Sequence, residues 1–495
     1  MNKSIIGLFV LFFSMFAINV EAQRLMTLEQ SVEEALKQSP DIVRARYNLE
    51  RYRELLNAQK ASLKSNFRLD LSPFQYSNSR NYDQSNQTWY NDENFTTSGA
   101  FSVSQPILFT DGVVSLNNNF GWQTNKRDDI NFDPFTGFTN SLNLRLEQPL
   151  FTYNRRKMEY KEIEFNYENS QLNYALQALN VERQITQYFY QIYQAQMQLI
   201  TSREELANRK KSYEIIKNKV EAGLTAKEEM LQAELDMMSS ESTVQNNEVD
   251  LDNIKDNFKQ MLGMDFSEEI MVVAEVSVLP VDIDLQKATG FALENRMEIR
   301  QREIDVEMGL FDLITTNATN EFKGNLAVQV GLFGNAENVN NIYDRQNRND
   351  NQDVQFTLEV PLWDWGEKKA RMEAARLAQE TNEYNLLDEK KNIVLSVRQI
   401  ERNLKNYLKQ IEIARKNEEN AQLTYEINLE KYQNGDLTSM DLNLVQNQLT
   451  QAKNNKIDAL ISYKLELLNM KLQTLFDFEN QRSIMPDVIN YETIQ

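Results

Sequence analysis

Two hydrophobic patterns alternate along the chain, and the more extensive one has apolar residues spaced by four and three positions. This spacing is typical of long helices that pack along a shared apolar seam. The seam runs through Val181, Ile185, Tyr188, Ile192, Ala195 and Leu199 in the first half, and through Ile393, Val397, Ile400, Leu404, Tyr407, Ile411 and Ala414 in the second. It predicts two helices of about 100 Å, near 154–221 and 366–433, with shorter return helices near 225–263 and 438–475.

The second pattern is a strict alternation of apolar and polar residues, which predicts strands with one apolar face. It occurs at Phe67, Leu69 and Leu71, at Leu142, Leu144 and Leu146, and at Leu326, Val328 and Val330. Each run is about 9–12 residues, the length that a tilted strand needs to cross a bilayer. The segments 78–96, 125–138 and 335–352 are rich in Asn, Asp, Ser and Gln, and we expect them to be outward loops. A soluble β-sandwich is the alternative.

Several segments recur in the second half and indicate an internal duplication. The turn sequence around Gly223 returns around Gly435, and the strand-to-helix segment at Pro149 returns at Pro361, both 212 positions later. An N-terminal helix start returns at Leu285 with a larger shift of 257 positions. The first half therefore carries additional residues between its helix start and its strand end.

The two shifts differ by 45 residues, which is enough for one more β-hairpin. We expect its strands near 97–108 and 113–124. Because an even number of added strands returns the chain to the same side, the helix that follows keeps its direction.

Composition narrows the function classes. The chain has 495 residues with only 14 Gly and 8 Pro, which favours one elongated body of long elements. Its net charge of -20 disfavours nucleic acid as a partner. His and Cys are both absent, so the usual proton shuttle, the thiolate nucleophile and nearly all zinc sites are excluded. We predict no enzyme, no cofactor and no metal site, and we interpret paired carboxylates such as Glu204 and Glu205 as solvated helix faces.

The N-terminus has the pattern of a secretory signal peptide. Lys3 precedes an apolar run from Ile5 to Val20, and Ala22 stands where a signal peptidase would cut. A retained membrane anchor is the alternative. No later stretch approaches the length of a spanning helix, so any later membrane crossing has to be made by strands.

The duplicated order of helix, strands, proline segment, long helix, glycine turn and return helix resembles the TolC family of outer-membrane channel proteins. The turns read Ala222-Gly-Leu-Thr and Asn434-Gly-Asp-Leu-Thr, and the proline segments read Gln-Pro-Leu and Val-Pro-Leu. The resemblance implies a mainly α-helical chain with membrane β-structure that forms a homotrimer in the outer membrane of a Gram-negative bacterium. Each chain would give strands to one shared β-barrel and helices to a long coiled-coil barrel across the periplasm. Family members have four strands per chain, and the extra hairpin departs from that number.

With this resemblance, the chain divides into consecutive segments whose bounds follow from the repeats. They are a signal peptide (1–22), N-terminal helices (23–64), β-barrel strands with the inserted hairpin (65–151), a long helical hairpin with its periplasmic tip near 223 (152–263), an equatorial linker (264–284), second-repeat helices (285–320), further barrel strands (321–363), a second helical hairpin with its tip near 435 (364–475) and a C-terminal tail (476–495). Pro149 and Pro361 mark the barrel-to-helix junctions.

The resemblance also assigns roles to residues at the two turns, where the tunnel closes and a periplasmic adaptor docks. The docking surface would comprise Gly223, Leu224, Thr225, Gly435, Leu437 and Thr438. Asp441 matches a constriction aspartate, and Tyr432 matches an aromatic that bonds an acidic residue of the first turn, for which Glu229 is the candidate. Three copies of Asp441 would form a ring that attracts cations. Leu437 and Leu444 replace polar residues of that lock found in relatives.

Simpler interpretations remain open for these residues. Asp441 and Glu229 could be solvated acids at helix starts, stabilised by the helix dipole. The glycines could serve only to end helices in left-handed geometry.

The leading hypothesis is an exit duct: a passive, gated outer-membrane channel of a tripartite efflux or type I secretion system. It would work with a periplasmic adaptor (membrane fusion) protein and an inner-membrane pump, and it would contact outer-membrane lipid. The alternative is a periplasmic coiled-coil adaptor or structural filament protein without channel activity. A periplasmic hydrolase has little support without His or Cys.

Overall fold

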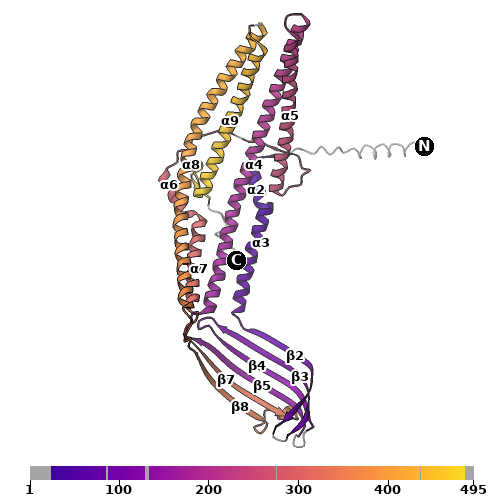
Figure 1. Ribbon diagram of the computed structural model, residues 1–495, viewed down its shortest axis with the longest axis vertical. Coiled ribbons are helices and arrows are strands. Elements are labelled where there is room, and N and C mark those ends of the chain that lie inside the picture. Colours follow the sequence, from indigo (N-terminus) through magenta and orange to yellow (C-terminus); the bar gives the residue numbers. More distant parts are fainter. Residues whose placement is uncertain (1–23, 85–86, 129–132, 275, 435, 485–495) are drawn as a thin grey trace, which may run out of the picture. The chain divides into compact units, whose positions relative to one another are not determined.

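The computed structural model describes residues 24–84, 87–128, 133–274, 276–434 and 436–484 (Figure 1). They fall into two compact units, which are described in turn. One unit contains the chain up to Asn48, Gln171–Ile299 and the chain from Asp388 on, and the other contains Leu49–Ser170 and Arg300–Leu387. The expected signal peptide, Gly435 and the tail from residue 485 lie outside the described residues.

The second unit is built on one antiparallel sheet of six strands in the order β2-β3-β4-β5-β7-β8. The strands are β2 (Asn66–Asp83), β3 (Thr88–Ile107), β4 (Gly112–Arg127), β5 (Phe135–Leu150), β7 (Lys323–Ala336) and β8 (Arg348–Glu359), with a short 3-10 turn, η1 (Val339–Asn341), before β8. β4 pairs with β3 over its whole length, from Arg127 opposite Asp92 to Gly112 opposite Ile107, and the two strands also pair with β2 and β5 on either side. The expected extra hairpin is therefore a central part of this sheet.

The register separates the sheet into an apolar face and a polar face, as the alternation predicts. Leu144 lies opposite Leu116 on one side and Val330 on the other, whereas Arg145 lies opposite Ser115 and Gln329. Directly opposed residues of an antiparallel pair point to the same side. We define the apolar sheet face by Phe67, Leu69, Leu71, Phe101, Val103, Leu116, Leu144, Val330, Val354, Phe356 and Leu358, and the polar sheet face by Arg68, Asp70, Ser102, Ser115, Asn143, Arg145, Glu147, Gln329 and Asp353.

Five of the strands are longer than the alternation predicts, with 14–20 residues, while β8 has the expected 12. Much of the segment 78–96, which we expected to be a loop, is paired between β2 and β3. Backbone groups form the ladder whatever the side chains are, so a polar stretch extends a hairpin as well as an apolar one. Polar composition was therefore a poor marker of where these strands end.

Four helices meet this sheet: α3 (Pro40–Ser62), α4 (Arg155–Glu221), α7 (Met297–Asn317) and α8 (Glu367–Asn434). Within the sheet unit, α7 binds α4 through Arg300, whose guanidinium lies 2.6 Å from the Glu168 carboxylate. That carboxylate raises the pKa of Arg300 above its ordinary value. Gly309 of α7 faces Gln379 of α8 so closely that a methyl group would collide with it.

The other unit contains the remaining helices, α2 (Leu28–Gln38), α5 (Lys227–Leu262), α6 (Leu285–Asn295) and α9 (Ser439–Thr474), with the far parts of α4 and α8. Two short strand pairs join its connecting segments, β1 (Arg24–Met26) with β6 (Ile270–Val272) and β9 (Phe476–Asp477) with β10 (Arg482–Ser483). The predicted seams are confirmed, since Val181, Ile185, Ile192, Val397 and Leu404 are buried. The long helices begin and end within two residues of the expected bounds.

The start of α2 shows how local sequence sets these elements. The Thr27 hydroxyl accepts from the Gln30 amide, and the Gln30 side-chain oxygen accepts from the Thr27 amide, which completes a capping box. Ala35 and Ile42 are fully buried on either side of the break at Pro40. Among the described residues, no helix combines the length and the apolar composition that crossing a membrane requires.

Candidate functional site at the helical turns

The first turn joins α4 to α5 and depends on Gly223. Gly223 has a φ of +75°, a left-handed conformation that glycine adopts without strain. The amide of Leu224 donates to the Lys219 carbonyl at 2.8 Å, which closes the end of α4. Leu224 is 76% exposed, and Thr225 is half-buried. The turn thus presents an apolar side chain to its surroundings.

The second turn joins α8 to α9 and is closed in the same way. The amide of Asp436 donates to the Lys431 carbonyl at 3.0 Å, while Gly435 itself lies outside the described residues. Thr438 is the N-cap of α9. Leu437 is half-buried against the cluster beneath the turns, so it differs from the exposed Leu224 of the first turn.

A small hydrophobic cluster lies beneath both turns and holds the two helical hairpins together. Its buried members are Ile216, Ala233, Tyr425, Tyr432, Leu442 and Leu449. Tyr432 of α8 is only 3% exposed. The Lys219 ammonium of α4 lies 5.0 Å from the centre of the Tyr432 ring and donates to the Tyr432 carbonyl at 3.4 Å. We did not single out Lys219 from the sequence, although it lies inside the repeated turn segment.

The expected bond between Tyr432 and Glu229 is not formed within the chain. The Tyr432 hydroxyl is buried and has no hydrogen-bond partner among the residues that the structure describes. Burial, together with the negative charge of Glu229, raises the pKa of Tyr432 to about 12. Glu229 is exposed in the first turn of α5. The two residues therefore influence each other electrostatically without a direct bond.

Asp441 belongs to the helix start of α9. Its amide donates to the Thr438 hydroxyl oxygen at 3.2 Å, and its carboxylate accepts from the same hydroxyl at 2.7 Å. Its side chain is exposed. Within one chain these contacts are those of a helix-start acid, and they bring Asp441 together with neither Tyr432 nor Glu229.

A buried cation, Arg209 of α4, lies deeper in the same region and was missed in the sequence. Its guanidinium is 3.2 Å from Glu205, 3.7 Å from Asp236 of α5 and 2.8 Å from the Asn447 oxygen of α9. Asn443 of α9 also donates to Asp236. Arg209 itself is only 8% exposed, and its network joins three helices.

The place of Arg209 in the four-and-three spacing could have revealed it in the sequence. Continuing the four-and-three spacing past Leu199 leads through Leu206 to Arg209 and then to Ile216, so an arginine occupies a seam position. A charge on an apolar seam needs partners. Our interpretation of Glu204 and Glu205 as solvated was accordingly wrong for Glu205, whose side chain is 17% exposed beside Arg209.

Several polar pairs join α4 and α9 beside their apolar contacts. Gln194 donates to Asp458 at 2.6 Å, and Lys453 binds Glu204 at 2.7 Å. The Thr450 hydroxyl donates to Glu205 at 3.3 Å. The polar groups of such pairs can exchange their partners for water.

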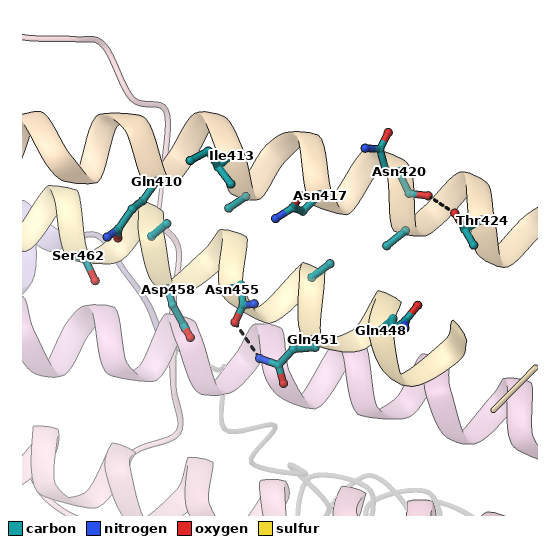
Figure 2. Close-up of a pocket in the computed structure, with 14 residues that line it drawn as sticks. Gln410, Ile413, Asn417, Asn420, Thr424, Gln448, Gln451, Asn455, Asp458 and Ser462 are labelled. Atoms are coloured by element: carbon teal, nitrogen blue, oxygen red, sulfur yellow. Dashed lines mark hydrogen bonds between the residues drawn. The ribbon is translucent and has the colours of Figure 1, made fainter. Parts of the chain in front are cut away.

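A groove of about 730 Å³ lies between α8 and α9 (Figure 2). Amide side chains such as Gln410, Asn417 and Asn455 project along it. Its lining includes small residues at seven-residue intervals, which are Ala414 and Ala421 on α8 and Ala452 and Ala459 on α9. Small residues at this spacing leave room for a further helix to approach. Among the described residues, no group of acidic side chains is arranged to hold a metal ion.

The two strand-to-helix junctions differ in structure. Pro149 lies inside β5 opposite Asn325, whereas Pro361 follows the end of β8 and is exposed. Phe151 and Trp365 follow them in left-handed conformations with φ of 59° and 55°. Both aromatic side chains are well exposed, as are Leu362 and Trp363. Aromatic residues between strands and helices are typical of a membrane interface.

Comparison with known proteins shows one family. Residues 113–264 and 325–472, more than half of the chain, match the family model described as outer membrane efflux protein. No sequence among curated proteins matches the chain significantly.

Solved structures of outer-membrane channels are similar over nearly the whole chain. The CmeC channel of Campylobacter jejuni has a TM-score of 0.68 at 15% identity, covering 94% of this chain and 88% of that one. VceC of Vibrio cholerae has a TM-score of 0.66 at 12% identity, covering 92% and 96%. The open state of the MtrE channel of Neisseria gonorrhoeae has a TM-score of 0.64 at 13% identity, covering 93% and 91%. At these identities the likeness concerns the fold.

Proposed function

Because the chain belongs to the outer membrane efflux protein family, it is an outer-membrane efflux channel, and we propose that it is a gated homotrimeric exit duct. In this proposal three chains share one β-barrel in the membrane and one helical tunnel in the periplasm. The duct itself is passive, and an inner-membrane pump supplies the energy through a periplasmic adaptor protein.

The observation that carries the proposal is the open sheet with one apolar face. Its outer strands, β2 and β8, each have a strand neighbour on one side only among the described strands. Unpaired backbone groups are not tolerated in lipid, so a single sheet has to close with other copies. Phe67 and Leu69 on β2 and Phe356 on β8 belong to the same apolar sheet face. Joining β2 of one chain to β8 of the next would continue that face around a barrel.

The helical turns suit the gate and the adaptor. Three copies of Asp441 on exposed helix starts would form an acidic ring, and Tyr432 with Glu229 would adjust the closed arrangement. Leu224, which is exposed, would contact the adaptor at the tip. The other residues of the proposed docking surface are Gly223, Thr225, Gly435, Leu437 and Thr438. The small residues that line the groove between α8 and α9 support a docking surface for an adaptor helix. Either a tripartite efflux system or a type I secretion system would use such a duct.

Membrane fractionation, mass determination in detergent and conductance measurements together test the proposal. The protein should sediment with outer membranes, run as a trimer in detergent and conduct ions in planar lipid bilayers. A detergent-free soluble protein without conductance would instead support the periplasmic adaptor or filament alternative, which the long helical seams motivate. A monodisperse monomer in detergent would overturn the proposed trimer.

A further inference from the structure

The extra hairpin of β3 and β4 changes the barrel that this chain can build. In the sheet, β3 lies between β2 and β4, and β4 lies between β3 and β5, so neither strand can leave without breaking the ladder. Phe101 of β3 lies opposite Leu69, and Leu116 of β4 lies opposite Leu144, so both hairpin strands continue the apolar sheet face. Ser102 and Ser115 continue the polar sheet face in the same way.

The turn of this hairpin is fixed at the helix side of the sheet. The Asn154 side chain donates to the Leu108 carbonyl at 2.6 Å and to the Phe109 carbonyl at 3.1 Å. Asp111 accepts from the amides of Arg155 and Arg156 at the start of α4 and pairs with the Arg156 guanidinium at 3.2 Å.

This contact caps α4 with a residue from the hairpin, because free amides at a helix start need acceptors. Gln148 adds a hydrogen bond to the Thr110 carbonyl at 2.6 Å. The hairpin therefore spans the sheet from end to end and is held to the helices below it.

We propose that β3 and β4 are wall strands, so that three chains close an eighteen-stranded barrel with a wide polar lumen for a bulky, hydrated cargo. This inference rests on the proposed trimer, with six strands from each chain. Strands about 4.8 Å apart and tilted by about 40° give eighteen strands a perimeter of roughly 110 Å. Twelve strands would give only about 75 Å.

The wider barrel also fits the helices. Four helices of each chain, α3, α4, α7 and α8, meet the sheet, which makes twelve in a trimer. At about 9–10 Å between axes, a ring of twelve helices has a perimeter of roughly 110–120 Å. The tunnel and an eighteen-stranded barrel would thus join at nearly equal width, and size selection would fall to the tip. Arg68, Asp70, Arg145 and Glu147 on the polar sheet face would keep the lumen hydrated.

Single cysteines test the hairpin directly, because the natural chain has no Cys. Phe101→Cys and Ser102→Cys report on the hairpin, and Leu144→Cys and Arg145→Cys report on β5 as the matched pair. The protein in liposomes is treated with a charged thiol reagent that does not cross lipid. A cysteine facing lipid should react at least about tenfold more slowly than its neighbour facing the lumen, since apolar surroundings that raise a thiol pKa by one unit lower the thiolate tenfold.

The labelling outcomes test separately whether the hairpin is part of the barrel wall and whether the sheet forms a membrane barrel. Slow reaction at positions 101 and 144 with fast reaction at 102 and 145 supports the eighteen-stranded wall. Equal, fast reaction at 101 and 102 with preserved alternation at 144 and 145 overturns the wall role of the hairpin but leaves the channel. Loss of alternation at 144 and 145 overturns the membrane barrel itself.

Exclusion of polymers from the channel tests the width of the barrel lumen. Neutral polyethylene glycols of increasing size are added to the barrel side of single channels in planar bilayers. Deleting residues 88–127, which are β3 and β4, leaves four strands and should lower the largest polymer that enters by about one third in diameter. An unchanged size limit in a conducting deletion variant would overturn the inference. Should that variant fail to assemble, the labelling of the full-length chain still decides.

Discussion

Arg209 of α4 donates a hydrogen bond to the Asn447 side chain of α9 at 2.8 Å, from a seam position that would otherwise hold an apolar residue. The pair joins the first helical hairpin to the second beneath the turns. It lies next to the small cavity that Tyr432 also lines, so the polar network and the hydrophobic cluster form one region.

Replacing Arg209 should loosen this region. Arg209→Met leaves Glu205 and Asp236 without their cation, so we expect a loss of about 2 kcal/mol in the stability of the helical part. The resting conductance in planar bilayers should rise because α4 is held less firmly to α9. Thermal unfolding followed by circular dichroism measures the first effect and single-channel recording the second.

Arg203→Met is the matched control on the same helix. Arg203 forms a 2.6 Å ion pair with Glu248, but both side chains are about half exposed. Exposed pairs contribute little, so this variant should change stability by less than about 0.5 kcal/mol. Equal unfolding midpoints for the two variants would show that the buried network does not hold the hairpins together.

Substitutions at Asp441 and Thr438 separate the effect of the Asp441 charge from the effect of capping α9. Asp441→Asn keeps a side-chain acceptor for the Thr438 hydroxyl but removes the charge, so stability should hold while block by divalent cations weakens. Thr438→Ala should cost about 1 kcal/mol through the lost N-cap and leave cation block intact. Titration of channel current with a divalent cation measures the block. Unchanged block in Asp441→Asn would rule out the acidic ring.

Tyr432 should tolerate loss of its hydroxyl but not of its ring. Tyr432→Phe removes a buried group without a hydrogen-bond partner in the described part of the chain, so stability should stay the same or rise by up to about 1 kcal/mol. Tyr432→Ala leaves a cavity in the cluster and should lower the stability by about 3–5 kcal/mol. The unfolding midpoints of the two variants measure this contrast. A marked loss in Tyr432→Phe would mean that the assembled trimer supplies a partner for the hydroxyl.

Two left-handed glycines should respond differently to alanine. At Gly223 an added Cβ meets no atom of the described residues within 4 Å, so Gly223→Ala carries only backbone strain of about 1–2 kcal/mol. At Gly263, the C-cap of α5 with a φ of 72°, the same Cβ would lie 2.8 Å from the Gln38 carbonyl. Gly263→Ala should therefore destabilise the protein clearly more than Gly223→Ala in thermal unfolding. The reverse order would contradict the close packing of α5 against the break between α2 and α3.

Periodicity alone determined the long helices of this protein. Apolar residues at four-and-three spacing, such as Val181 and Ile185, face the interior because they recur on one side of a helix, and that is a local property of the chain. The turn at Gly223 was predictable for a similar reason. The residue that ends a helix in a left-handed conformation is usually glycine. The alternation at Leu144 and Arg145 likewise assigned the two faces of β5.

Only the tertiary structure decided which distant groups meet. The sequence predicted the extra hairpin but not its place, and the register of β3 and β4 put it in the middle of the sheet. It suggested a bond between Tyr432 and Glu229 that the chain does not make, and it left Arg209 unnoticed. Periodicity specifies the side of an element on which a residue lies. Which partner it faces depends on how separate helices and strands are packed, and that depends on the whole chain.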